Sequence, residues 1–514
     1  MFAPIIFVRM SSGQIARQSF WASVVNYSGS LLGLFTTFYV FPLVFSPAEL
    51  GVTRVFIEIG ALLAAVAQLG TGYSIWKFFP RFKDEHGHHG AGFWLLVIPL
   101  FGFLILGLAL LGFQSQLLHF FGANAAQFEP YYLWLLPFVF FFVFNTVFET
   151  FSASLGHIIF PAFLRENVVR IALGGLGFLY YLKWIGFAQS MQWIPFVYGF
   201  VAILNLGNIV KLTTLSFRPD FGFIRSQPDL TSEFSKYTLY FFLTTLANLF
   251  VQRLDMLMVS SVKGWADSGV YAIAINMAVL IEVPTRSILQ VANPKLSEAL
   301  HRDDHAEVQR LYTKTSLNQF LLGAMVLLCI WLGLDAFYAF MPKGDVYQAG
   351  KMAVLLLGLG KLFVLMQGNS SAMLAFSKKY YWALSINAIA VLVALLMNRW
   401  LIPLYGLNGA ALATASTWLA ISIVTGLLVW RIYRMHAFHA AMRKAFLFVL
   451  LLVAWTGTVE WGWPQFETLG VLGQTLIKSA TVLIPAVVLL WKFNISEDVN
   501  SLLRKAGAQL RQML

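Results

Sequence analysis

Residues 92–112 read GFWLLVIPLFGFLILGLALLG, a run without a single charged side chain. A helix of about 20 apolar residues can cross the roughly 30 Å of hydrocarbon in a bilayer. Similar runs recur from Phe20 to Phe493, separated by short polar breaks. The sequence therefore predicts an all-α polytopic membrane protein of about fourteen transmembrane helices. We place them at residues 19–45, 52–79, 92–112, 131–156, 159–182, 191–214, 236–260, 268–293, 315–340, 350–376, 380–402, 407–430, 445–462 and 470–491.

Composition also indicates that lipid, and not water, is the solvent of this chain. Of its 514 residues, 59% are hydrophobic and 11% are charged, whereas an ordinary soluble domain carries about 25% charged residues. The only cysteine is Cys329, so no intramolecular disulfide can form. The formal net charge of +12 is compatible with a nucleic-acid partner, so the distribution of the charge has to decide.

The basic residues are distributed as membrane topology requires. Cytoplasmic loops of membrane proteins are enriched in Lys and Arg. With the N-terminus inside, the inner segments of the predicted topology hold 23 basic residues and the outer loops hold five. The five are Lys183, Lys263, Lys343, Lys351 and Arg399. The charge therefore indicates an inner-membrane protein with both termini in the cytoplasm, and no nucleic-acid partner is expected.

An internal repeat predicts how the spans are grouped. The motif AELGV at 48–52 returns as ADSGV at 266–270, 218 residues later. Two six-helix lobes follow, at 1–234 and 235–440, with an interlobe linker at about 215–235. Because each lobe has an even number of spans, the repeats should run parallel, related by a pseudo-two-fold axis along the membrane normal. Two extra helices at 441–493 and a cytoplasmic amphipathic tail at 494–514 complete the chain.

Ionisable residues inside the spans are the candidate functional residues, because each costs about 2.5–3.5 kcal/mol at the centre of a membrane helix. Five basic residues are expected to line a water-filled lumen that attracts an anion, namely Arg54, Arg170, Arg253, Arg286 and Lys361. Glu58, Asp255 and Glu282 are candidates for ion coupling or for pairing with these cations. The alternative is that the charges form structural ion pairs between packed helices, and this reading is preferred for Glu149, Arg165 and Glu166.

Helix breakers mark candidate hinges for a transport cycle. Pro284 lies between Glu282 and Arg286 in the eighth span, and Gly70 and Gly72 lie in the comparable stretch of the second. A fixed kink is the alternative reading of the proline.

Sites for metals, cofactors or catalysis are not expected. The histidines His86, His88 and His89 lie in a glycine-rich loop and are expected to be solvated. The sequence shows no nucleotide-binding glycine loop and no arrangement of nucleophile and base, so we expect neither an enzyme nor an ATP-driven pump.

Three stretches resemble a known superfamily. FPAFLRENVVRI (160–171), RLDMLMVSSVKGWADSGVYAIAINMAVLIEVPTRSILQVANPKLSE (253–298) and IPLYGLNGAALATASTW (402–418) resemble the polysaccharide-exporter (Wzx-like) branch of the multidrug/oligosaccharidyl-lipid/polysaccharide (MOP) flippases. The similarity covers nearly all of residues 11–440. It implies two lobes around a lumen and transport, by alternating access, of a polyprenyl-pyrophosphate-linked oligosaccharide to the outer leaflet, as in lipopolysaccharide synthesis. It also implies contact with membrane lipids, with glycan polymerases or glycosyltransferases as candidate partners.

Three alternatives stay open. A cation-coupled multidrug antiporter on the same fold would need acidic groups to dominate its cavity. Fourteen spans also resemble lipid II flippases, but no basic residue lies between Gln18 and Phe45, where those flippases carry arginines. A glycan polymerase or ligase usually has a large periplasmic loop, whereas no predicted outer loop is much longer than about 17 residues.

Overall fold

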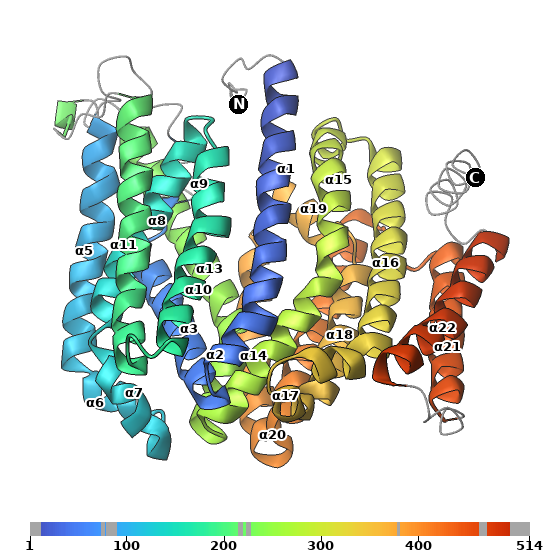
Figure 1. Cartoon of the computed structure of the whole chain (residues 1–514). Coiled ribbons are helices and arrows are strands. Elements are labelled where there is room, and N and C mark those ends of the chain that lie inside the picture. Colours follow the sequence, from blue (N-terminus) through green and yellow to red (C-terminus); the bar gives the residue numbers. More distant parts are fainter. Residues whose placement is uncertain are drawn as a thin grey trace. The chain divides into compact units, whose positions relative to one another are not determined.

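The computed structural model describes the backbone of most of the chain (Figure 1). The described residues are 12–72, 74, 78, 90–213, 219–222, 228–377, 381–461 and 470–493. Every regular element in these ranges is a helix, which confirms the predicted all-α class. Residues 215–218 and 223–227 of the predicted linker, the tail at 494–514 and the three loop histidines lie outside the described residues.

The chain forms two compact units, Met1–Gly269 and Val270–Leu514. This division is made by packing, and the lobe boundary expected at 234/235 from the repeat stays a prediction. The first unit contains α1 (Ser12–Phe35), η1 (Thr36–Val40), α2 (Phe41–Val44), α3 (Pro47–Ala67), α5 (Ala91–Gly112), α6 (Gln114–His119), η3 (Gly122–Asn124), α7 (Ala125–Tyr132), α8 (Leu135–Ser154), α9 (Ile159–Phe163), η4 (Leu164–Val168), α10 (Val169–Tyr181), α11 (Phe187–Leu212), α13 (Pro228–Val262) and the start of α14 (Trp265–Val279).

The second unit begins within α14 and holds the remaining helices. These are η5 (Leu280–Glu282), α15 (Val283–His301), α16 (His305–Phe340), α17 (Gly344–Tyr347), η6 (Gln348–Gly350), α18 (Lys351–Met366), α19 (Ser370–Phe376), α20 (Trp382–Tyr433), α21 (Ala440–Trp461) and α22 (Val471–Phe493). The elements η1 and η4 are π-helical, and η3, η5 and η6 are 3₁₀-helical.

The number of spans agrees with the prediction of about fourteen. Twelve helical stretches of the described residues are long and apolar enough to cross a membrane. Residues 159–181 add one more, because the π-turn η4 divides that span into short pieces. Another comes from α20, whose 52 residues leave helical geometry at Gly406 (φ 59°, ψ −129°). The chain reverses there, since a Cβ on Gly409 would overlap the carbonyl of Leu401. The protein is therefore a multi-pass membrane protein.

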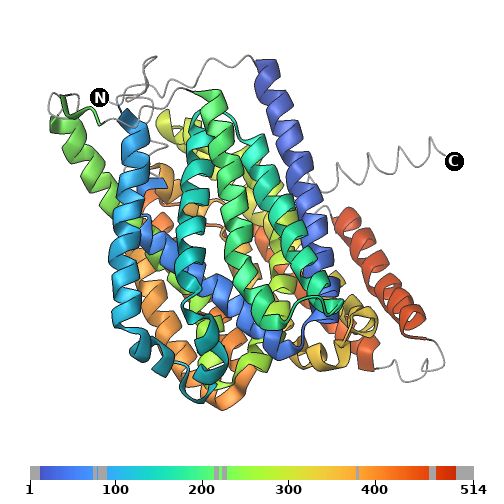
Figure 2. The same cartoon turned by 60° about the vertical axis from the view of Figure 1, so that its left-hand side comes forward.

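The core of the first unit lies between α3, α5, α8 and α11. Along α8, Val139, Val143 and Val147 are fully buried and pack with Ala64 of α3 and Ile209 of α11. The spacing of four residues places the three valines on one helix face. Figure 2 shows α8 and α11 running side by side as teal and green helices.

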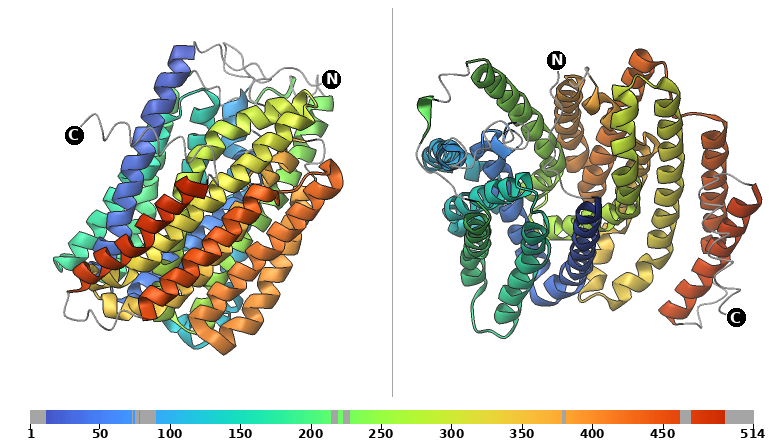
Figure 3. Two further views of the ribbon diagram at one scale, coloured as in Figure 1. Left: turned by 90° about the vertical axis from the view of Figure 1, so that its right-hand side faces the viewer. Right: turned by 90° about the horizontal axis from the view of Figure 1, so that it is seen from above.

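The two extra helices pack on α16 of the second unit. Met442, Ala445 and Phe448 of α21 and Ala486 of α22 are buried in one cluster with Phe320 of α16. Figure 3 shows α21 and α22 in red beside the yellow α16. The predicted pair of additional spans is thus an integral part of this unit's core.

One proline leaves a backbone carbonyl that a side chain satisfies. Proline has no N–H, so the carbonyl four residues earlier in a helix loses its donor. Pro485 of α22 frees the carbonyl of Thr481, which accepts a hydrogen bond of 3.0 Å from the indole Nε1–H of Trp455 on α21. This contact supplies the partner that a freed carbonyl needs in the absence of water.

Candidate functional site

The predicted basic residues of the first unit lie on α3, α10 and α13. Arg253 of α13 forms an ion pair with Glu58 of α3, and both side chains keep some exposure, 30% and 18%. Arg54 and Glu58 are four positions apart and lie on one face of α3, but Glu58 pairs with Arg253 of α13 and not with Arg54. The pair therefore ties the second span to the seventh.

Arg54 is the predicted cation of this unit that has no carboxylate within ion-pair distance among the described residues. Its Nη2 donates a hydrogen bond of 3.2 Å to the hydroxyl of Thr37, and its guanidinium carbon lies 5.4 Å from the ring centroid of Phe41. Thr37 belongs to the π-turn η1, an irregularity that is frequent at functional sites. Arg54 also lies within electrostatic range of Arg170 and Tyr198.

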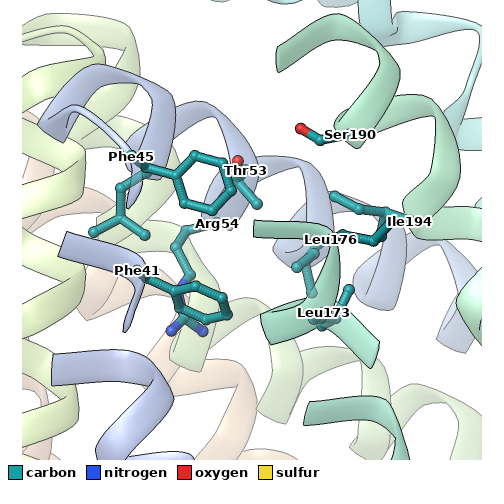
Figure 4. Close-up of a pocket in the computed structure, with 10 residues that line it drawn as sticks. Phe41, Phe45, Thr53, Arg54, Leu173, Leu176, Ser190 and Ile194 are labelled. Carbon is teal, nitrogen blue, oxygen red and sulfur yellow. The ribbon is translucent and has the colours of Figure 1, made fainter. Parts of the chain in front are cut away.

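A small cavity of about 40 Å³ lies against Arg54. It is lined mainly by apolar side chains of α2, α3, α10 and α11, and Figure 4 shows the Arg54 guanidinium directed towards Phe41. A buried water needs about 10–15 Å³ of such space, so the cavity has room for water beside the cation. It is too small for a glycan.

Arg170 is held against the first span by two glycines. Its Nη1 lies 2.8 Å from a carboxylate oxygen of Glu166 and donates to the carbonyl of Gly29. A Cβ on Gly33 would stand 2.9 Å from Nε of Arg170. The spacing Gly29-x-x-x-Gly33 lets a helix approach closely, and here it leaves room for the arginine side chain. This motif is a signal that the sequence analysis missed.

The π-turn η4 gathers further charges beside Arg170. Arg165 forms ion pairs with Glu149 of α8 and with Glu166. Asn167 donates to the carbonyl of Val25 on α1 at 3.3 Å. These contacts agree with the structural reading that we preferred for Glu149, Arg165 and Glu166.

Asp255 does not share the face of Arg253. Its side chain is buried, with 3% exposure, and its Oδ1 accepts a hydrogen bond of 2.7 Å from the backbone N–H of Met256. Residues two apart on a helix do not face each other.

In the second unit, Lys361 and Glu282 form a close pair. The ammonium Nζ of Lys361 on α18 lies 2.6 Å from Oε1 of Glu282, and the side chains are 14% and 26% exposed. The same Nζ lies 4.0 Å from the ring centroid of Trp418 on α20. Trp418 lies in one of the stretches that carry the resemblance, but nothing in the sequence of that stretch indicates that this residue belongs to the site.

Arg286 lies one turn beyond Glu282, on α15, and is exposed. It forms no ion pair with the acids that the structure describes. Among the described residues, Arg286 and Arg54 are thus the two predicted cations without a carboxylate, whereas Arg170, Arg253 and Lys361 each have one.

The predicted hinges coincide with breaks in the helices. The second span stops at Ala67, and Gly70 has a φ of +78° beyond it. A Cβ on Gly70 would stand 2.5 Å from the carbonyl oxygen of Thr238. Gly72 follows in helical geometry. In the eighth span the 3₁₀ turn η5 directly precedes Pro284 at the start of α15. Whether the chain bends there during transport stays a prediction.

The described residues hold no group of three or more His, Cys, Asp or Glu side chains placed to bind a metal ion. The charged groups placed within the described spans are ammonium, guanidinium and carboxylate groups, with aromatic rings beside some of them. Ammonium and guanidinium groups bind anions through charge-assisted hydrogen bonds.

Comparisons with known proteins identify this fold. A family of polysaccharide biosynthesis proteins matches residues 193–317. The lipid II flippase MurJ in an inward closed conformation is 16% identical, with a TM-score of 0.72 over 93% of this chain and 100% of that one. An inward-facing multidrug resistance MATE family transporter of the MOP superfamily is 16% identical, with a TM-score of 0.61 over 80% of this chain and 98% of that one. No curated protein sequence matches the chain.

A third solved structure agrees with these two. A MOP superfamily transporter from Pyrococcus furiosus is 16% identical, with a TM-score of 0.55 over 82% of this chain and 95% of that one. At such identities the likeness establishes the fold alone. This is the fold that the resemblance to the MOP superfamily predicts, and the solved proteins named above that share it are a flippase and transporters.

Proposed function

We propose that this chain is a flippase that exports a polyprenyl-pyrophosphate-linked oligosaccharide from the cytoplasmic to the outer leaflet by alternating access through a cationic lumen. The observation that carries the proposal is a set of five basic side chains within the spans of a transporter fold. The match of residues 193–317 to polysaccharide biosynthesis proteins supports a glycan as part of the cargo.

The chemistry of the basic residues favours a phosphate-containing passenger. A guanidinium group donates in a planar fork that matches phosphate oxygens. Arg54 and Arg286 have no carboxylate partner among the described residues, and Arg253 and Lys361 keep partial exposure beside theirs. In this proposal the pyrophosphate is bound by the cations while the polyprenyl tail remains in lipid.

The membrane potential supplies a direction. With the inside negative, moving one charge across 100 mV is worth about 2.3 kcal/mol. Outward movement of a dianion therefore gains about 4–5 kcal/mol. This proposal places the chain in a bacterial inner membrane with both termini in the cytoplasm, as its basic loops predict. Gly70, Gly72 and Pro284 are the proposed points of bending.

Ion coupling is an addition to this scheme and not a requirement. Glu58 and Glu282 are each paired with a cation in the structure, so a proton or sodium ion would have to compete with that cation. Asp255 is buried, with 3% exposure. A cation-coupled antiporter would instead need carboxylates free of basic partners, and the pairing of Glu58 and Glu282 weighs against that alternative.

The lipid that co-purifies with the protein tests the proposal. The full chain, extracted in mild detergent, should carry a polyprenyl pyrophosphate bearing sugars, identified by mass spectrometry of the bound lipid. The double variant Arg253→Ala/Arg286→Ala should lose this lipid while keeping bulk phospholipid. Recovery of lipid II instead would support the lipid II alternative, and recovery of phospholipid alone from the unmodified protein would contradict the proposal.

A further inference from the structure

The pair Lys361–Glu282 brings together three spans of the second unit. Glu282 lies in the 3₁₀ turn between α14 and α15, Lys361 near the middle of α18, and Trp418 on α20. The ammonium is 2.6 Å from the carboxylate and 4.0 Å from the centroid of the indole. Lys361 therefore has an ionic partner on one helix and an aromatic partner on another.

The indole ring of Trp418 packs closely against the helix that carries Lys361. A Cβ on Gly360 would stand 2.9 Å from Cε3 of Trp418 and 2.7 Å from Cα of Ala415. Only a residue without a side chain leaves room for this approach. Glycine at position 360 therefore allows the indole ring to pack against the α18 backbone directly beside Lys361. These contacts of the ring involve Gly360 and Ala415 and not Glu282.

We infer that Glu282 is an internal competitor of the transported anion for Lys361, and that Trp418 is the positioning residue that keeps Lys361 in place during the exchange. The inference rests on the proposed function and identifies how its binding site is regulated. The cargo phosphate displaces the Glu282 carboxylate on binding, and the carboxylate displaces the phosphate on release.

The exchange is physically reasonable for three reasons. Both side chains are partly exposed, so an incoming anion can reach the ammonium. A pyrophosphate carries more negative charge than the single carboxylate, and lysine binds either one as a point charge. The cation–π contact with Trp418 is present whichever anion is bound, so the ammonium is not left without a partner between the two states.

The place of Glu282 in the chain links the exchange to the backbone. The 3₁₀ turn Leu280–Glu282 is wound more tightly than an α-helix and has hydrogen bonds of poorer geometry, and Pro284 at the start of α15 cannot supply an N–H to it. The ion pair is thus a side-chain tie between this irregular turn and α18. Displacement of Glu282 removes the tie at the predicted hinge.

The chain contains a matched control for the experiment. On the same helix α18, Lys351 lies 2.6 Å from Asp335 of α16 and 5.1 Å from the ring centroid of Trp331. Both sites thus combine a lysine, a carboxylate and a tryptophan. The control lies ten residues away, about 15 Å along the helix, and is not part of the proposed lumen.

Binding of a soluble probe separates the two sites. Farnesyl pyrophosphate is titrated into the detergent-purified full chain. Its dissociation constant is measured for the unmodified protein and for Glu282→Gln, Lys361→Met and Asp335→Asn. The apparent affinity is reduced by the fraction of protein in which the site is open. If the ion pair is broken in about a tenth of the molecules, Glu282→Gln binds about tenfold more tightly.

Transport distinguishes competition from a structural role. Glu282→Gln should bind the probe more tightly and yet turn over more slowly, because no carboxylate returns to expel the anion. Trp418→Leu should weaken binding, and Trp418→Phe should restore most of it. Asp335→Asn should behave as the unmodified protein. If Glu282→Gln proves unstable, Glu282→Asp tests the same point, since its shorter side chain weakens the pair and should also tighten binding.

The outcomes separate the inference from the proposed function. If the unmodified protein and Asp335→Asn bind the probe, Lys361→Met does not, and the Glu282 variants bind no more tightly, the competitor role is overturned and the proposed function stands. If the unmodified protein does not bind the probe at all, both are overturned.

Discussion

Gly51 lies against the backbone of Trp265, and in return Gly269 lies against the backbone of Pro47, where α3 crosses the start of α14. A Cβ on either glycine would overlap the carbonyl oxygen of its partner. Gly51 and Gly269 are 218 residues apart, and so are Pro47 and Trp265. A reciprocal contact of this kind is expected where a two-fold axis relates two segments, and the parallel repeat stays a prediction from the sequence.

Alanine at either crossing glycine should destabilise the protein. The added methyl group has no space beside a backbone carbonyl, and overpacking of this kind typically costs about 1–3 kcal/mol. Thermal unfolding in detergent should show a lower midpoint for Gly51→Ala and for Gly269→Ala. Gly175→Ala is the control, since a Cβ there meets nothing within 4 Å. Equal midpoints for all three variants would show that the crossing is looser than described.

Gly33 and Arg170 should be energetically coupled. A side chain at Gly33 would push Arg170 away from Glu166, so Gly33→Ala should cost about 1–3 kcal/mol. In a background in which Arg170 is already replaced by alanine, the same change should cost little. Equilibrium unfolding of the two single variants and the double variant gives the coupling energy. If the free-energy changes of the two single variants simply add in the double variant, Gly33 is not required for the position of Arg170.

Trp455 should matter only while Pro485 is present. Trp455→Phe removes the donor to the Thr481 carbonyl and should cost about 1 kcal/mol or more, because a carbonyl without a donor is unfavourable inside a membrane span. Pro485→Ala restores a backbone N–H four residues beyond Thr481, so the tryptophan change should then cost little. Unfolding midpoints of the four combinations measure this. An unchanged penalty in the Pro485→Ala background would contradict the role assigned to the indole.

The spans could be predicted because lipid imposes a length and a composition on each one. The fifth span shows the limit, since the π-turn at Leu164–Val168 leaves the hydrophobic run unchanged while altering which side chains meet. Gly406 is similar, because the chain reverses there without a polar loop.

The partners of the charges were less predictable. A spacing of four residues allows Arg54–Glu58, Glu166–Arg170 and Glu282–Arg286 alike, but among these only Glu166–Arg170 forms an ion pair in the described residues. Glu58 and Glu282 turn instead to Arg253 and Lys361 on other helices. The packing of distant segments decides between such pairs, and one sequence does not reveal it.

Translocation in reconstituted vesicles tests the central claim most directly. A fluorescent polyprenyl-pyrophosphate oligosaccharide is placed in one leaflet, and its appearance in the other is measured by quenching. The unmodified protein should move the lipid, and Arg253→Ala and Arg286→Ala should each slow it at least about tenfold, the effect of about 1.4 kcal/mol, at equal protein abundance. Lys351→Ala should transport normally. Transport at the unmodified rate by both arginine variants would contradict the cationic path.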